Sequence, residues 1–302
     1  MCGENLGLVN VGRRNLDFVA VCALLWCACA CVSQAQDTAL AGETSSAAQT
    51  GQTGSATGQA SSAPATSTKL IQEEVGDRDI TYLRTRAVFR YDYKEQNGST
   101  ETNRFRLKLV YGFGAPQRFG VAVNVPVVWM QTPTGTVFGS GDTDITGGVV
   151  VYQTKQVRTG FLGEVTVPTA SENALGGGNT NLKGTWGITC VLSSRFEFYG
   201  SFSYKQSVST SRGAPVKQFE PDVAVNMRVL KTTWYVESDS YYDFNPEQFA
   251  PMVKTGLARG WGSTKSWTTT AYIEWPLNAY ARATQHHLNV GLDVTWYPFK
   301  ER

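Results

Sequence analysis

The chain has 302 residues, of which 41% are hydrophobic, 12% aromatic and 17% charged, and its formal net charge is only +2. This balance gives no electrostatic reason to bind nucleic acid, and 30 glycines with many aromatics favour a β-rich fold over a helical bundle. Beyond the N-terminus no run of about 20 apolar residues occurs, which excludes a membrane-spanning helix there.

Residues 1–35 have the features of a cleaved secretory signal peptide. Arg13 and Arg14 supply positive charge before an apolar run over residues 18–32. Residues 33–35, Ser-Gln-Ala, place small side chains where a signal peptidase reads them, so we expect cleavage after Ala35. A twin-arginine signal is the alternative for Arg13 and Arg14.

Three further features of the N-terminal region bear on its role. Lipidation is an open alternative for the cysteines of the apolar run, which are Cys27, Cys29 and Cys31. Residues 36–68 consist almost entirely of Ala, Ser, Thr, Gly and Gln, which predicts a disordered tether. Residues 69–80 form a linker or a short periplasmic helix, with a plug of the mouth as the alternative.

From residue 81 to the C-terminus, apolar and polar residues alternate in stretches of roughly ten. A period of two places the two sets on opposite faces of a strand. Long strands that are apolar on one face and charged on the other predict a transmembrane antiparallel β-barrel over residues 81–302, in a bacterial outer membrane. In the second stretch, one face carries Phe105, Leu107, Leu109 and Tyr111, and the other carries Arg104, Arg106 and Lys108.

The pattern predicts twelve strands, joined alternately by short turns and longer loops. This rhythm is typical of bacterial barrels, which have their short turns in the periplasm. Aromatic residues near the strand ends predict the two interfacial girdles. The girdle residues are Tyr93, Tyr111, Phe113, Trp129, Trp234, Phe244, Trp267, Trp275 and Trp296. The strands are residues 81–93, 103–113, 119–129, 142–153, 159–168, 181–192, 195–205, 219–229, 233–244, 251–257, 266–276 and 287–299.

Sorting charged residues by strand parity predicts two walls that face the lumen. Strands one and two supply a basic wall, and strands eight and nine supply an acidic wall roughly opposite in a ring of twelve. Such walls would create a field across a pore that orients charged or dipolar solutes. The alternative is that the charges pair and fill the interior. The basic wall comprises Arg84, Arg86, Arg90, Arg104, Arg106 and Lys108, and the acidic wall comprises Glu220, Asp222, Glu237, Asp239 and Asp243.

Pro126 interrupts an otherwise regular third strand, and proline removes one hydrogen-bond donor from a β-ladder. The next strand is rich in glycine. The seam between these two strands is therefore the weakest one predicted, and we consider it a candidate lateral opening for apolar solutes. An ordinary bulge is the alternative.

The segment Gly139-Ser140-Gly141-Asp142, followed by Asp144, is the most motif-like part of the chain. It resembles the Gly-x-Gly-Asp signature of a family of outer-membrane transporters found with meta-pathway phenol degradation genes. Residues 165–169 and 176–179 resemble other parts of that family, although Ala170 stands where the family usually has glycine. The resemblance implies a β-barrel that takes up aromatic or other hydrophobic compounds. Locally, we expect Gly139 and Gly141 to form a tight turn with positive φ, and the two aspartates to point into the lumen.

These features predict a porin-like channel for passive uptake of a small aromatic or hydrophobic solute. Its partners are outer-membrane lipid, the solute and the barrel-assembly machinery, and no nucleic acid. A non-conducting structural or adhesive barrel is the second hypothesis. The third is a rim hydrolase, but we expect no enzyme, because the only histidines are the adjacent His286 and His287 and no Gly-x-Ser-x-Gly occurs. We expect no cofactor and no metal.

Overall fold

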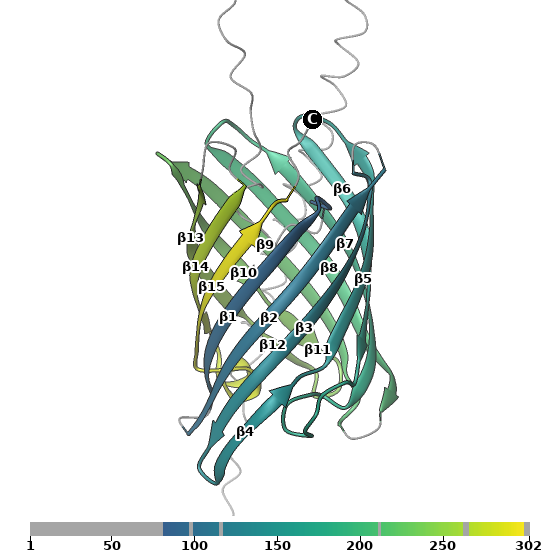
Figure 1. Ribbon diagram of the computed structural model, residues 1–302, viewed down its shortest axis with the longest axis vertical. Helices are drawn as coiled ribbons and strands as arrows, with labels where there is room; N and C mark the ends of the chain where they lie inside the picture. The colour runs from purple at the N-terminus through teal and green to yellow at the C-terminus, as the bar shows by residue number, and fades with distance from the viewer. Residues whose placement is uncertain (1–80, 97–98, 115–116, 211–212, 262–265, 299–302) are drawn as a thin grey trace, which may run out of the picture. The chain divides into compact units, whose positions relative to one another are not determined.

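The computed structural model describes residues 81–96, 99–114, 117–210, 213–261 and 266–298, and these form one closed antiparallel sheet (Figure 1). The expected signal peptide, tether and linker, with Cys27, Cys29 and Cys31, lie outside the described residues. The expected class, an all-β barrel, is confirmed.

Twelve strands make the ring, each paired with its neighbours, and β10 closes it by pairing with both β9 and β13. The last strand pairs with the first from Ala87–Trp296 to Glu95–Leu288. The strands are β1 (Arg86–Gln96), β2 (Thr100–Phe113), β3 (Phe119–Thr132), β5 (Thr143–Gln153), β6 (Val157–Val167), β7 (Asn179–Val191), β8 (Phe196–Thr210), β9 (Lys217–Val229), β10 (Thr232–Asp239), β13 (Met252–Trp261), β14 (Trp267–Pro276) and β15 (Leu288–Trp296).

Three short strands continue members of the ring after an interruption. They are β4 (Gly135–Ser140) before β5, β11 (Tyr241–Asp243) after β10 and β12 (Gln248–Ala250) before β13. All three lie toward the end where β4 projects in Figure 1. We call this the outer end, and the end where β1 starts and β15 stops the inner end. The connections at the inner end are short turns, which are periplasmic in bacterial barrels.

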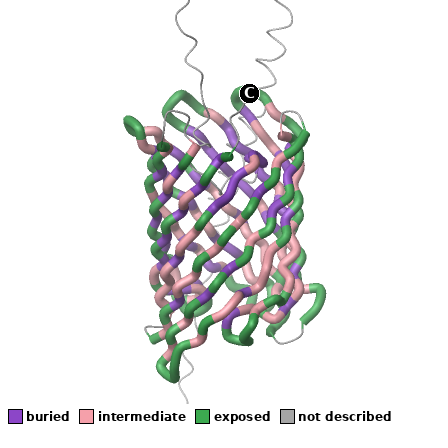
Figure 2. The backbone as a smooth tube through the Cα atoms, viewed as in Figure 1, coloured by how far each residue is buried: buried purple, intermediate pink, exposed green. Residues whose placement is uncertain are grey.

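The alternation of the sequence is the alternation of the barrel wall, with exposed and buried residues taking turns along each strand (Figure 2). On β2 the four apolar residues of the outward face are 38–60% exposed, whereas the basic residues between them are partly buried. Eight of the nine girdle aromatics are exposed, and only Tyr93 is half-buried. The exterior is therefore an apolar surface suited to lipid.

The structure corrects several of the expected boundaries. Residues 81–85 are not part of the first strand, which begins at Arg86. Residues expected in the loops 94–102 and 130–141 instead extend β1, β2 and β3 and form β4. Residues of the expected connections 206–218 and 258–265 also extend β8, β9 and β13. The expected loop 277–286 contains the helix α3 (Ala279–Thr284). No helix in the described ranges is long and apolar enough to cross a membrane.

Candidate functional site

The basic residues of the lumen are largely paired with acids on neighbouring strands. Arg90 binds Asp293 of β15 through two hydrogen bonds, Nε to Oδ1 at 2.6 Å and Nη2 to Oδ2 at 2.7 Å. Arg106 Nη2 donates to Oδ2 of Asp92 on β1 at 2.5 Å, and the Asp92 side chain is fully buried. These pairs neutralise charge across adjacent strands, within the wall that was expected to be basic.

Three residues of the expected acidic wall, Glu220, Glu237 and Asp239, are likewise bound by cations. Lys254 Nζ lies 2.8 Å from Glu237 Oε1, 3.0 Å from Asp239 Oδ2 and 3.5 Å from Glu274 Oε2. Glu220 of β9 pairs with Lys183 of β7. Asp222 lies on β9 directly opposite Ser201 of β8 and Asp239 of β10. Strands β2 and β9 are six strands apart in both directions around the ring, so they lie opposite each other as expected. Strands β1 and β10 are only four apart on the shorter side, so they do not.

On the inward faces of β1 and β2, the side chains of Lys94 and Arg104 are in no ion pair within 4 Å among the described residues. Lys94 pairs in register with Thr102, so Arg104 is its diagonal neighbour on the same inward face. The Nε of Arg104 is buried without a hydrogen-bond partner. After the local pairing, an electropositive spot therefore remains on the β1–β2 wall.

At the inner end, residues 81–85, which we call the inner segment, lie inside the barrel. The side chain of Leu83 packs against the inward faces of Gly120 on β3 and Gly148 on β5, where an added Cβ would approach it to 3.0 and 3.1 Å. Thr85 Oγ1 accepts a hydrogen bond from Gly112 N at 3.0 Å. Thr81 Oγ1 lies 3.3 Å from Thr189 Oγ1 on β7. The segment therefore contacts the wall from β2 to β7.

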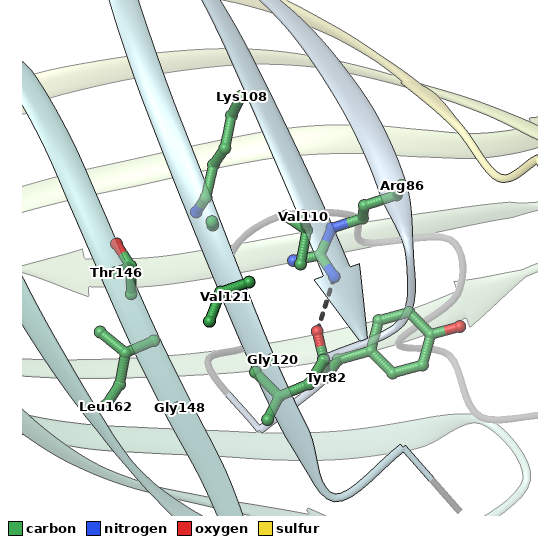
Figure 3. A pocket seen from close by; sticks show the side chains of 11 residues that line it. Tyr82, Arg86, Lys108, Val110, Gly120, Val121, Thr146, Gly148 and Leu162 are labelled. Carbon is green, nitrogen blue, oxygen red and sulfur yellow. Dashed lines mark hydrogen bonds between the residues drawn. The ribbon is translucent and has the colours of Figure 1, made fainter. Parts of the chain in front are cut away.

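Arg84 and Arg86, expected to line an open pore, hold this segment instead. Arg86 Nη1 donates to the carbonyl of Tyr82 at 2.6 Å (Figure 3). It also donates to the carbonyl of Arg84 at 3.1 Å. The Arg84 guanidinium lies 4.7 Å from the centre of the Tyr297 ring, which follows β15. A cavity of about 40 Å³ remains between the segment and the wall, beside Lys108 and Ala122.

At the outer end, α3 covers one side of the mouth. Its Ala281 is fully buried against Tyr241, Ala250 and Met252, residues of β11, β12 and β13. Tyr280 OH donates to Asp243 Oδ2 at 3.2 Å. Burial and the nearby Asp243 carboxylate raise the pKa of the Tyr280 phenol to about 12, so the phenol remains a donor at neutral pH.

The Gly-Ser-Gly-Asp motif lies on the other side of the mouth, at the interruption between β4 and β5. Neither glycine has positive φ, so the expected tight turn is wrong; both are needed because other groups approach them closely. On the side facing β4 and β5, the ladder of β3 skips Val125 and Pro126, and the Pro126 carbonyl accepts a hydrogen bond from Gly141 N at 3.0 Å. Asp144 accepts from Asn124 and Thr166 of the wall, both at 2.9 Å, and Asp142 from a loop described below.

Several lumen residues were missed by sequence reasoning. Strand parity alone could have placed Lys94, Glu274 and Asp293 inside, since each follows the alternation of its strand. The inner segment has no such signal, because its alternation continues that of β1 without a break.

No family model and no curated protein sequence matches this chain. Among solved structures, the COG4313 outer membrane channel from Pseudomonas putida F1 has a TM-score of 0.60 at 12% identity, covering 74% of this chain and 99% of that one. A NanC porin has a TM-score of 0.51 at 9% identity, covering 70% and 100%. The likeness concerns the fold. With its closed ladder and apolar exterior, the described chain is a twelve-stranded bacterial outer-membrane β-barrel.

Proposed function

We propose that this barrel is a channel for passive uptake of a small solute that is aromatic or otherwise hydrophobic and carries negative charge. The observation that carries the proposal is the polar lumen inside an apolar wall, with Lys94 and Arg104 left without ion pairs. A solute that enters meets these two cations in a medium of low dielectric constant, where they attract an anion more strongly than in water.

The aromatic part of the proposal is supported by the resemblance of the Gly-Ser-Gly-Asp segment to a family of transporters for such compounds. The inner surface also offers apolar and aromatic contacts. Tyr82, Leu83 and Val110 line the cavity at the inner end. A flat, weakly polar anion is a ligand that such a surface suits.

Single-channel current of the purified protein in a planar bilayer with a salt gradient tests the proposal. We expect small discrete steps and a reversal potential that reports anion preference. Replacing both Lys94 and Arg104 with Ala removes the unpaired charges, so the anion preference is expected to fall strongly. Arg259→Ala is the matched control, because Arg259 lies on the exposed exterior, 4.3 Å from the Trp261 ring. A change in selectivity equal to that of the control would contradict the role of the two cations.

A non-conducting structural barrel remains the second candidate, and a specific observation favours it. Ion pairs occupy much of the described lumen, and the inner segment, α3 and a further loop cover its ends. A correctly folded barrel that passes neither ions nor small solutes would establish this function and overturn the channel.

The rim hydrolase gains no support from the geometry. His286 is 1% exposed, with Nε2 2.9 Å from Glu274 Oε1, and the backbone of His287 donates to Glu95 O at 2.6 Å. A substrate at the rim does not reach the buried His286. The His287 side chain is exposed, but among the described residues no serine or carboxylate is hydrogen-bonded to it.

A further inference from the structure

We infer that Leu175 is the residue that limits solute size at the outer mouth, and that Asp142 is the positioning residue that holds it there. Leu175 belongs to the connection between β6 and β7, residues 168–178, which we call the outer loop. The inference rests on the proposed channel function and assigns a part of the channel to its selectivity.

The carboxylate of Asp142 binds the outer loop at both of its ends. Its Oδ2 accepts a hydrogen bond from Gly177 N at 2.7 Å, and its Oδ1 accepts one from Ala170 N at 3.2 Å. Hydrogen bonds to an ionised acceptor are about twice as strong as neutral ones. One side chain, placed at the interruption between β4 and β5, therefore fixes the start and the end of an eleven-residue loop.

Backbone contacts along the same interruption extend the attachment. Ser171 N donates to Ser140 O at 3.1 Å, and Ser171 Oγ accepts from Ser140 N at 3.1 Å. Thr169 Oγ1 accepts from Thr143 N at 3.0 Å. The loop thereby pairs with the edge of β4 that faces away from β3, where the ladder between β5 and β6 has ended.

The glycines of the motif make room for this close approach. A Cβ at Gly139 would overlap Ser171 Oγ, and it would lie 3.1 Å from Leu175 Cδ1. A Cβ at Gly141 would lie 3.2 Å from Leu175 O and 3.0 Å from Pro126 Cγ. A Cβ at Gly176 would overlap Asp142 Oδ1. Any larger residue at these positions would push the loop away from the wall.

Leu175 lies on the inner side of the wall. Gly139 is the register partner of Val128, and Val128 is 1% exposed between the outward-facing Val127 and Trp129. Because Leu175 packs on the inward face of Gly139 and is itself only 6% exposed, its side chain fills part of the lumen below the outer rim. A solute that enters on this side has to pass the loop or displace it.

The test compares Asp142→Asn with Asp144→Asn in flux measurements on proteoliposomes, using neutral solutes of increasing size. The asparagine amide accepts at only one of its two ends, so one loop amide loses its acceptor and both lose the charge. We expect the balance between held and released loop to shift by about tenfold toward release, and larger solutes to enter. Asp144→Asn is the matched control, because the hydrogen bonds of Asp144 go to Asn124 and Thr166 of the wall and not to the outer loop.

Leu175→Ala tests the narrowing itself and leaves the attachment intact. It is expected to raise the size limit as Asp142→Asn does, with little change in the passage of the smallest solutes. It also serves if Asp142→Asn does not fold. Unchanged size limits in Leu175→Ala would overturn the assignment of Leu175, whatever Asp142→Asn does.

A reversible cross-link separates the position of the loop from other effects of the substitution. Ser140→Cys with Ser171→Cys, in a background whose other cysteines are replaced, joins two positions whose backbones are already linked by the hydrogen bond from Ser171 N to Ser140 O. In the Asp142→Asn variant, oxidation is expected to restore the original size limit and reduction to raise it again. If wild-type protein passes no solute at all, the channel function fails. If it conducts but Asp142→Asn equals Asp144→Asn, only this inference fails.

Discussion

The two ends of the barrel are narrowed by different means. At the inner end, the inner segment contacts the wall from β2 to β7 through glycine surfaces, threonine hydroxyls and two arginines. At the outer end, the outer loop is held by the Asp142 carboxylate and by hydrogen bonds of Ser140, Thr143, Thr169 and Ser171. The inner attachment is spread over contacts with several strands, and no single contact dominates it. The outer attachment has one ionised acceptor that binds two loop amides, so the Asp142 substitution is expected to weaken it most.

The largest effect is expected when both ends are opened in one molecule. Two narrow passages in series act like two resistances, so removing one leaves the other in control of the current. Gly112→Ala combined with Asp142→Asn is therefore expected to raise single-channel conductance by more than the sum of the two single increases. A purely additive result would show that the ends do not limit the same path.

Gly112→Ala alone is expected to have the next largest effect. An added Cβ would overlap the carbonyl oxygen of Leu83, and backbone atoms cannot move aside as the end of a flexible side chain can. We expect the inner segment to be pushed away from β2 and conductance to rise, by less than in the double variant because the outer loop still limits the current. Gly163→Ala is the control, since a Cβ there meets nothing within 4 Å. Heat-modifiable gel mobility confirms that both variants remain folded.

Arg86→Ala is expected to have a moderate effect of the same kind. It removes the donors to the carbonyls of Tyr82 and Arg84, so the inner segment loosens and conductance rises with little change in selectivity. Arg104→Ala is expected to change selectivity with little change in conductance, because Arg104 has no contact with the inner segment. If both variants change only selectivity, Arg86 lines an open passage as the sequence suggested.

The smallest effect concerns the seam at Pro126, which we retain as a separate proposal for a lateral route. Pro126→Val restores a backbone donor, although the outer loop already covers the inner side of this seam. Slower uptake of an apolar solute by this variant, with unchanged conductance, would support lateral passage. Uptake at the parent rate counts against it.

The barrel itself was predictable from the sequence because a period of two separates lipid-facing from inward residues on every strand. The sequence placed residues 81–85 in the first strand, and this prediction was wrong. Leu83 and Thr85 continue the alternation of β1, but contacts with Gly112, Gly120 and Gly148 on distant strands draw them inside. Such contacts depend on the closed ring, which no local pattern reports.

At α3, in contrast, the signal was present in the sequence and was passed over. Asn278 caps the helix by accepting from Ala281 N at 2.8 Å, and alanine has the highest helix propensity.

The charged site was predictable only in part, because parity gives the face of a strand and not its partner. Arg90 and Asp293 are 203 positions apart, and only the register that closes the ring brings them together. The same holds for Asp142, whose role depends on where the outer loop folds. The glycines of its motif point to a close approach, but the sequence does not say which group approaches.

All three interruptions of the sheet lie toward the outer end, whereas the ladder closer to the inner end continues around the ring, with a register shift in β5 between Val150 and Tyr152. This division has an evolutionary consequence. Insertions, deletions and exchanges in the outer connections alter what the mouth admits, and they leave the hydrogen bonds that fix the barrel's diameter untouched. The same barrel wall can therefore carry different outer connections, and descendants of this barrel can change their solute before they change the strands of the wall.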